Sequence, residues 1–405
     1  MKYLVLAFVL LLAACSKTFD KLSPQTTTVN SKTSIDEKQS CNFGMTEFNL
    51  TKRPLGSGDA NKIRPRKTSV PPPVTPPVTP PVTPPVVPPV STSVIYLDFD
   101  GTLVSGTMWN VYGDIKCAPA ILTADEISNI YQRVETDYSP FNITITTDEN
   151  VYNNANPQKR IRVIVTDSWE WYGQAGGVSY LNSFTWGNNT PCFVFSSLLG
   201  YNTKKIAEAC SHEVGHTLGL RHQSAYDASG TKISEYNYGQ GTSEIGWAPI
   251  MGAAYYKNLS LWHNGHNSIS STTMQDDIAI ISGVVGFQND DYSNSISNAA
   301  ALSTSKTGII NSNNDVDFFS VNLSITKQVS VVPQNVGAND DGGNLDIVLS
   351  VYDSQGVLLS TINDPFVLNA VTTLAPGSYY LAVSTADNQY ITRYGMLSKY
   401  NISVN

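Results

Sequence analysis

The sequence predicts an α+β fold, in which a part that contains a helix is followed by an all-β sandwich. Three observations predict it. With 41% hydrophobic, 10% aromatic and 14% charged residues, the chain is globular and β-rich and cannot be a disordered polyelectrolyte. Residues 204–210 are helix-compatible and lack proline and glycine. After residue 289, short alternating strands are broken by Asn, Asp, Gly and Ser. We therefore expect domains over residues 94–288 and 289–405.

The N-terminus has the pattern of an export signal. Lys2 precedes the apolar run Leu4–Leu12, which is about as long as a signal core and too short to span a bilayer. The following Ala13-Ala14-Cys15 resembles the end of a bacterial lipoprotein signal. The resemblance implies a signal peptide over residues 1–14 and a lipidated Cys15. It also implies export to the outer membrane or cell surface, from which proteolysis could release the chain. An ordinary signal peptide with a chance cysteine is the alternative.

Proline and charge separate a tether from the body of the protein. Eleven of the 22 prolines lie in residues 71–89, where V-T-P-P nearly repeats. This predicts a polyproline II linker over residues 71–93, in which the twenty residues 71–90 span about 60 Å at roughly 3.1 Å per residue. Residues 15–70 are expected to be poorly ordered. Because that segment and Lys2 together have a net charge of +6 and the whole chain has −8, residues 94–405 carry −14. An acidic body argues against nucleic acid as a partner.

The strongest motif is H-E-V-G-H-T-L-G-L-R-H over residues 212–222. On a helix, His212 and His216 lie on one face, so both imidazoles can bind one Zn²⁺. Glu213 lies beside them, where it can act as general base and acid toward a metal-activated water. The motif therefore indicates a catalytic zinc site in which water takes the open position.

Gly219 and His222 make this motif specific. A glycine that takes positive φ can end the helix and return His222 to the metal as the third ligand. The whole pattern resembles the metzincin clan of zinc endopeptidases, in a bacterial reprolysin-like branch. The resemblance implies a metzincin-type catalytic domain with a mixed twisted sheet and an active-site helix, which would cleave proteins or peptides. It also implies a methionine turn, for which Met251 in Pro249–Gly252 is the candidate. Gln223 departs from the Asp usual in reprolysins.

The same resemblance suggests how substrate is held. Gly176–Leu181 alternates like a strand, and in metzincins the strand before the active helix aligns the peptide by β-augmentation. Astacins and serralysins have a tyrosine where Ala253 stands, so we assign no tyrosine ligand. The candidate substrate-binding residues are Gly177, Val178 and Ser179, with Tyr255 and Tyr256 as possible oxyanion donors.

The C-terminal part resembles a second family. Asn314–Phe319, Asn344–Leu349 and Pro376–Leu381 are similar to the bacterial pre-peptidase C-terminal domain, a jelly-roll-like module behind secreted peptidases. Some members bind Ca²⁺, and Asp315 and Asp317 are the candidates here. Turn-stabilising roles for both residues are the alternative.

The cysteines leave several pairings open. With Cys15 lipidated, four cysteines allow two disulfides in three connectivities. If Cys41 in the N-terminal segment does not take part, the other three allow one bridge and one free thiol. Cys192 and Cys210 flank the approach to the active helix and could staple it to the sheet. Cys41 could silence the zinc as in matrixin proenzymes, although its neighbours do not match the matrixin sequence. Cys117 is the fourth cysteine that remains for pairing.

Other patterns compete with this interpretation. Val94–Thr102 fits the opening of haloacid-dehalogenase-like phosphatases, with Asp98 as nucleophile, but no lysine-centred motif follows. We expect a first strand and turn instead. His263 and His266 lack nearby carboxylates and are expected in the surface or a cleft. The alternative function is a tethered adhesion or glycan-binding lipoprotein with a vestigial zinc domain, against which the complete ligand set and Glu213 argue. We expect a monomer.

Overall fold

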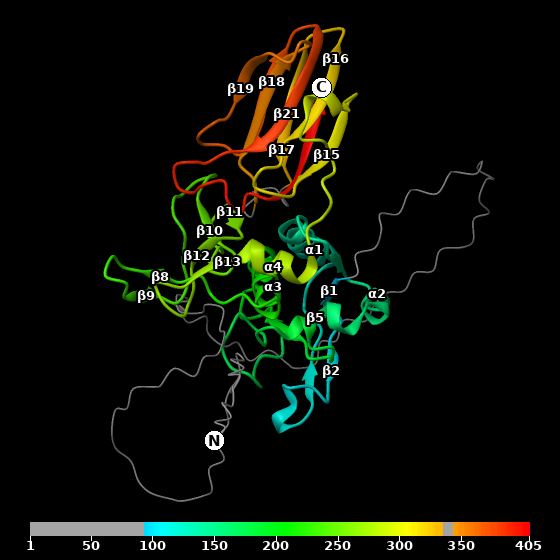
Figure 1. Ribbon diagram of the computed structural model, residues 1–405. Coiled ribbons are helices and arrows are strands. Elements are labelled where there is room, and N and C mark those ends of the chain that lie inside the picture. The colour runs from blue at the N-terminus through cyan, green and yellow to red at the C-terminus, as the bar shows by residue number, and fades with distance from the viewer. Residues whose placement is uncertain (1–92, 335–342) are drawn as a thin grey trace, which may run out of the picture. The chain divides into compact units, whose positions relative to one another are not determined.

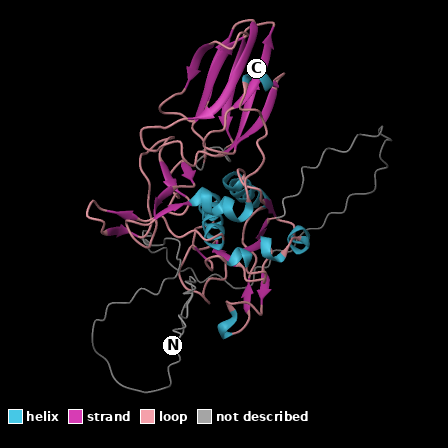
Figure 2. Cartoon of the chain, in the orientation of Figure 1, coloured by secondary structure: helices cyan, strands magenta, loops and turns pink. Residues whose placement is uncertain are grey.

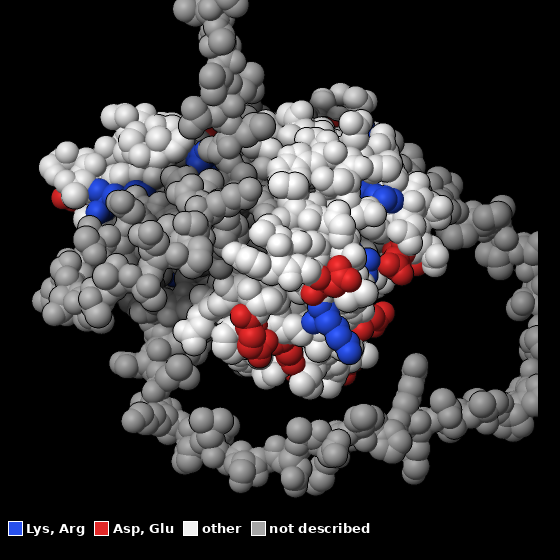
Figure 3. Space-filling model, turned by 90° about the horizontal axis from the view of Figure 1, so that it is seen from below, with Lys and Arg blue, Asp and Glu red and all other residues white. Residues whose placement is uncertain are grey.

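The computed structural model describes residues 93–334 and 343–405. The predictions on the signal peptide, Cys15, Cys41 and the proline linker lie outside this range. The described chain has mixed α/β structure, with many strands and few helices (Figures 1 and 2). None of its described helices is long and apolar enough to cross a membrane. On the face drawn in Figure 3, most of the described surface is uncharged, in keeping with 14% charged residues.

The first sheet has the strand order β4-β1-β5-β7-β6. The strands β4 (Thr144–Thr146), β1 (Val94–Asp98), β5 (Arg160–Thr166) and β7 (Cys192–Phe195) run parallel. Strand β6 (Gly177–Val178) pairs antiparallel with β7 and ends the order. Strands β1 and β7 are buried along their whole length, which explains why both are continuous apolar runs with little alternation.

Two helices pack against each other and against this sheet (Figure 1). Helix α1 (Ala124–Tyr138) begins with a capping box between Thr123 and Glu126, and it buries Ile130, Val134 and Tyr138 at helical spacing. Helix α3 (Thr203–Thr217) is almost entirely buried and begins at the side-chain cap of Asn202. Because α3 carries the histidine motif, the interior of the protein holds that motif in place.

The polypeptide after α3 forms three two-stranded sheets and a short helix before residue 288. The helix α4 (Asp277–Val285) starts at an Asp276 side-chain cap, as the carboxylates at its start predict. Smaller elements precede and surround these: α2 (Glu149–Asn154), the hairpin β2 (Thr102–Val104) and β3 (Ile115–Cys117), and the 3-10 turns η1 (Asn110–Tyr112), η2 (Pro157–Lys159) and η3 (Ser183–Thr185). The paired strands are β8 (Ala225–Tyr226) with β9 (Lys232–Ser234), β10 (Trp247–Pro249) with β11 (Leu259–Leu261), and β12 (Asn264–His266) with β13 (Met274–Asp276).

The C-terminal part consists of two sheets in a sandwich-like arrangement, as the alternating pattern predicts. Inward residues such as Phe319, Val321, Val329 and Val331 are buried and their neighbours less so. After η4 (Ile296–Asn298), one sheet has β14 (Ala300–Ala301), β16 (Asp317–Leu323), β21 (Gly377–Thr385), β18 (Ile347–Asp353) and β19 (Leu358–Ile362). The other has β15 (Ser305–Ile310), β22 (Ser398–Val404), β17 (Lys327–Pro333) and β20 (Ala370–Leu374).

Asn344, which precedes β18, is buried against residues that precede the C-terminal sheets. Its Nδ2 donates to Asp137 Oδ1 on α1 (3.0 Å) and to the Ser260 carbonyl on β11 (2.6 Å). The other Asp137 oxygen accepts from Ser211 Oγ on α3 (2.6 Å). An amide from the C-terminal part therefore completes a buried polar network next to the histidine helix.

Two alternatives from the sequence are settled by packing. Cys192 and Cys210, whose pairing the sequence left open, are not bridged: both are free thiols, as is Cys117. All three are buried, and burial raises the pKa of the Cys117 thiol to about 12. Asp98 lies on a buried strand, where its carboxylate accepts from Arg162 Nε (2.9 Å) and pairs with its guanidinium, so its side chain serves as an ion-pair partner.

Candidate metal centre

The three histidines of the motif come together at the C-terminal end of α3. Gly219 has φ 111°, which confirms the predicted helix-ending turn. The turn places His222 against the two helical histidines, with ring centroids 5.2 Å from His212 and 4.9 Å from His216. The three imidazoles offer nitrogen atoms that all lie within 4.8 Å of one another.

Backbone carbonyls orient the two helical histidines. Nδ1 of His212 lies 2.8 Å from the Ile250 carbonyl, and Nδ1 of His216 lies 2.7 Å from the Leu220 carbonyl. A carbonyl only accepts, so each Nδ1 carries the proton and each Nε2 keeps its lone pair. Burial, together with the neighbouring imidazoles, lowers the pKa of His212 and His216 well below their usual range. Both are therefore neutral, the form that binds metal.

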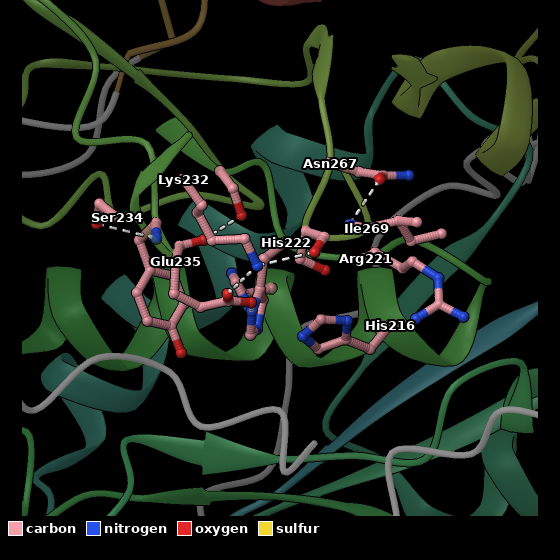
Figure 4. A network of polar contacts seen from close by, with 12 residues as sticks. His216, Arg221, His222, Lys232, Ser234, Glu235, Asn267 and Ile269 are labelled. Carbon is pink, nitrogen blue, oxygen red and sulfur yellow. Dashed lines mark hydrogen bonds and ion pairs between the residues drawn. The ribbon is translucent and has the colours of Figure 1, made fainter. Parts of the chain in front are cut away.

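His222 is oriented by a side chain. Its Nδ1 lies 2.6 Å from Glu235 Oε1, and the other Glu235 oxygen accepts from Lys232 Nζ at 2.8 Å (Figure 4). Burial would raise the pKa of Glu235, but hydrogen bonds from His222 and Lys232 lower it, so Glu235 is a carboxylate. Nothing in the sequence pointed to Glu235, which stands in a polar stretch with no motif spacing.

The donor set fits Zn²⁺. Nε2 of His216 and of His222 is buried and has no hydrogen-bond partner among the described residues, which is costly unless a ligand is bound. Three imidazole nitrogens with an open fourth position are a typical catalytic zinc set. No other histidine joins this group within residues 93–334 and 343–405.

Glu213 lies beside the histidines in a water-poor environment. Ser179 Oγ donates to its Oε2 at 2.6 Å, while Oε1 has no partner in the described chain. Burial raises the pKa of Glu213 well above its usual range, and the Ser179 hydrogen bond only partly opposes this. A carboxyl group with a raised pKa next to a metal-ligand set is suited to proton transfer.

The predicted substrate strand runs past this glutamate. A side chain at Gly177 would place its Cβ 2.7 Å from Glu213 Oε1, so only glycine allows the backbone of β6 to approach so closely. Strand β6 is the last in its sheet, and pairs with β7 on one side only in the described structure. The Val178 side chain is buried in an apolar cluster with Phe193 and Phe195, so only its backbone is available to a ligand.

The predicted methionine turn lies under the histidines. Met251 is fully buried and contacts Gly215 of α3, between the two helical histidines. Its carbonyl accepts from the Gln223 N–H at 2.8 Å, which ties the residue after His222 to this turn. Met251 therefore forms an apolar floor and offers no ligand atom to the site.

The two candidate tyrosines differ in position. The Tyr255 hydroxyl lies near Glu213: burial raises its pKa well above the usual range, with contributions from Tyr236 and Glu213. Tyr256 is 72% exposed and instead contacts Lys205, two turns before His212. A buried ring that sequence reasoning missed, Tyr236, lies 4.6 Å from the His222 ring. The structure thus brings Tyr255, and not Tyr256, toward the site.

His263 precedes strand β12 and His266 ends it, and neither joins the group of possible metal ligands. His263 packs 4.9 Å from the Trp247 ring, and burial, with the nearby His266, lowers its pKa to about 4. His266 is exposed. Their positions agree with the expectation of cleft and surface histidines.

A second cluster of possible ligands lies in the C-terminal part. Asp290, Asp291 and Asp317 bring carboxylate oxygens within 4.8 Å of one another. Asp317 was predicted, but Asp315 lies outside this trio and accepts from the backbone of Asn311 (2.8 Å). Burial, followed by the Asp315 charge, raises the pKa of Asp317 to about 8. Its Oδ1 is buried with no described partner, whereas its Oδ2 accepts from the Tyr400 hydroxyl at 2.5 Å.

Comparisons with known proteins show partial likenesses. No known family matches the chain, and no curated protein matches it. Among solved structures, the pre-peptidase C-terminal domain of collagenase from Bacillus anthracis is 17% identical. The match covers 29% of this chain and 98% of that one, with a TM-score of 0.19.

Two further solved structures match parts of the chain. The structure of myroilysin is 21% identical over 34% of this chain and 57% of that one, with a TM-score of 0.21. The periplasmic lysozyme inhibitor PliG of Aeromonas hydrophila is 13% identical over 25% of this chain and 82% of that one, with a TM-score of 0.16. At these scores, function has to be inferred from the site itself.

Proposed function

We propose that this protein is a zinc-dependent endopeptidase of the metzincin type that hydrolyses proteins or peptides. One observation carries the proposal: three converging imidazoles lie beside a buried glutamate and the edge of a sheet. His212, His216 and His222 would hold the ion. When bound, zinc would polarise the scissile carbonyl and supply a nucleophilic water at neutral pH.

The protein's own groups have separate roles in this reaction. Glu213 takes a proton from the attacking water and passes it to the leaving amine. Two features suit it to this role: its Oε1 has no hydrogen-bond partner in the described chain, and its pKa is raised. Ser179 holds the other carboxylate oxygen in place. The backbone of β6 aligns an extended peptide by pairing along its open edge. Tyr255 is the nearer candidate to stabilise the oxyanion.

We further propose that the enzyme is exported and lipid-anchored through Cys15, with the proline-rich segment as its tether, and that it is monomeric. The lipobox-like sequence before Cys15 and the eleven clustered prolines support this. Radiolabelled palmitate should be incorporated into the wild-type protein in a bacterial host, and Cys15→Ser should abolish the label. Equal labelling of both would exclude this anchor.

The function is tested on the chain without residues 1–14. It should bind one zinc per molecule and cleave casein or a peptide library, and a chelator should abolish cleavage. Glu213→Gln should retain zinc and lose cleavage. A zinc-loaded wild type without activity on any peptide would exclude the peptidase and favour a binding protein with a vestigial site.

We also propose that the cluster of Asp290, Asp291 and Asp317 binds Ca²⁺. Carboxylate oxygens are the ligands Ca²⁺ prefers, and a buried, unpartnered Asp317 oxygen is costly without a cation. Millimolar Ca²⁺ should raise the melting temperature of the wild type but not of Asp317→Asn. An equal shift in both proteins would place the calcium effect elsewhere.

A further inference from the structure

The third histidine is held differently from the other two. His212 and His216 are oriented by backbone carbonyls that no single substitution removes. His222 is oriented by the carboxylate of Glu235, a side chain 43% exposed that lies beyond strand β9. Of the three hydrogen-bond acceptors that orient the histidines, only the Glu235 carboxylate can therefore be removed by substituting a side chain.

Besides His222, two residues hold Glu235 in place, Lys232 and Ser224. Lys232 Nζ bridges Glu235 Oε2 and the Ser268 carbonyl, at 2.8 Å each. The Ser268 N–H donates to the His222 carbonyl (2.9 Å), so the bridge returns to the histidine backbone. Ser224 Oγ donates to the Glu235 carbonyl at 2.6 Å. The contacts of Glu235 with Lys232 and with His222 are seen from close by in Figure 4.

We propose that Glu235 is a positioning residue that sets how tightly the metal is held at His222. This rests on the proposed zinc site. By accepting from Nδ1–H, Glu235 fixes the tautomer that leaves the Nε2 lone pair facing the other two histidines, and it fixes the orientation of the ring. Without it, the imidazole keeps both tautomers and a wider range of ring rotation. The site then retains two well-placed ligands and one poorly placed ligand.

The test measures metal binding directly, using the chain without residues 1–14. Glu235→Ala should bind zinc about 10–100-fold more weakly in competition with a chromophoric chelator. Glu235→Gln should recover most of that loss, because a neutral amide oxygen can accept from Nδ1–H as the carbonyls do at His212 and His216. With cobalt in place of zinc, Glu235→Ala should show a changed visible absorption spectrum, and Glu235→Gln a spectrum close to that of the wild type.

Asp227→Ala is the matched control. Asp227 is an exposed carboxylate in the same β8–β9 hairpin, where it accepts from Ser229 and Thr231. If a loosened hairpin were the cause, Asp227→Ala would weaken zinc binding as much as Glu235→Ala, and the proposal would be overturned. Zinc affinity within twofold of wild type in Glu235→Ala, with an unchanged cobalt spectrum, would overturn it as well.

The outcomes separate this proposal from the proposed function. If the wild type does not bind stoichiometric zinc, both the proposed function and the role of Glu235 are wrong. A wild type that binds zinc and cleaves peptides, while Glu235→Ala binds zinc normally, removes only the role of Glu235. If Glu235→Ala fails to fold by circular dichroism, Glu235→Gln and Glu235→Asp decide. A Glu235→Asp variant, whose carboxylate is one methylene shorter, should bind zinc more weakly than Glu235→Gln, and the opposite order would contradict the positioning role.

Discussion

The candidate metal site is built from two regions of different character. The helical region contributes His212, Glu213 and His216, all fully buried, from α3. The loop region contributes His222, whose supporting carboxylate on Glu235 is 43% exposed. The first region is determined by a helical repeat and backbone carbonyls, and the second by side chains brought together by folding. One site thus combines two histidines oriented by the buried backbone with a third oriented by a partly exposed side chain.

The largest effect is expected in the helical region. Glu213→Gln leaves all three histidines in place, so zinc binding should persist. Hydrolysis should fall about 10²–10⁴-fold, because proton transfer to and from the water is lost. Steady-state cleavage of a fluorogenic peptide, with zinc content measured in parallel, checks both halves of this prediction. Parallel loss of zinc would show that Glu213 supports the metal instead.

A buried carboxyl group next to the loop region, that of Asp277 at the start of α4, should make stability depend on pH. Burial raises the pKa of Asp277, which accepts from Gln223 beside His222, to about 7. The folded state then binds this proton more tightly than the unfolded state, whose pKa is about 3.9. Its contribution is therefore greatest below about pH 4, falls by roughly 1.4 kcal/mol per pH unit up to about pH 7, and is constant above.

Asp277→Asn should remove this slope from urea unfolding curves measured between pH 4.5 and 8. Asp276→Asn, the matched control, keeps a good helix cap at the neighbouring position and should leave this slope in place. An unchanged slope in Asp277→Asn would show that other buried carboxyls dominate.

The helical region also depends on the C-terminal part. Asn344→Ala removes the amide that donates to Asp137, leaving a buried carboxyl oxygen without this donor next to α3. Urea unfolding should show a loss of about 1–3 kcal/mol. Asn401→Ala, an exposed asparagine on β22, should change stability by less than about 0.5 kcal/mol. Equal effects would mean that the buried network adds no stability.

The smallest effect on zinc affinity is expected from Lys232 in the loop region. Lys232→Met removes the cation beside Glu235 but leaves the contact between Glu235 and His222. Because both partners are partly exposed, the pair is worth about 0–1 kcal/mol. Zinc affinity should therefore fall less than about fivefold, and added salt should reduce it little further. If Lys232→Met lowered zinc affinity as much as Glu235→Ala does, Lys232 would be as important as Glu235 for orienting His222.

Local periodicity accounts for what could be predicted. The i, i+4 spacing put His212 and His216 on one helix face, and Gly219 marked the turn that returns His222. Alternation predicted the strands of the sandwich-like part, and the apolar residues from Val94 to Leu97 agreed with a first strand at β1. Each of these signals is carried by residues a few positions apart, which is why it survives in the sequence.

Long-range contacts account for what was missed or wrong. Glu235 reaches His222 through a hairpin, and Asp290 and Asp291 join Asp317 from before the first strand of the sandwich. The sequence left a bridge between Cys192 and Cys210 open, and the structure has both as free thiols in the core. No spacing rule encodes such partners, because they depend on how strands and loops pack.

The sequence by itself determined the ligand types, the helix that presents two of them and the glutamate between. It also determined the separation of an acidic body from a proline-rich segment. Only the tertiary structure decided which side chain orients the third histidine, which strand edge passes Glu213 and which carboxylates meet at Asp317. The reason is physical: a helix repeat is a property of neighbouring residues, whereas the surroundings of a buried group come from the whole fold.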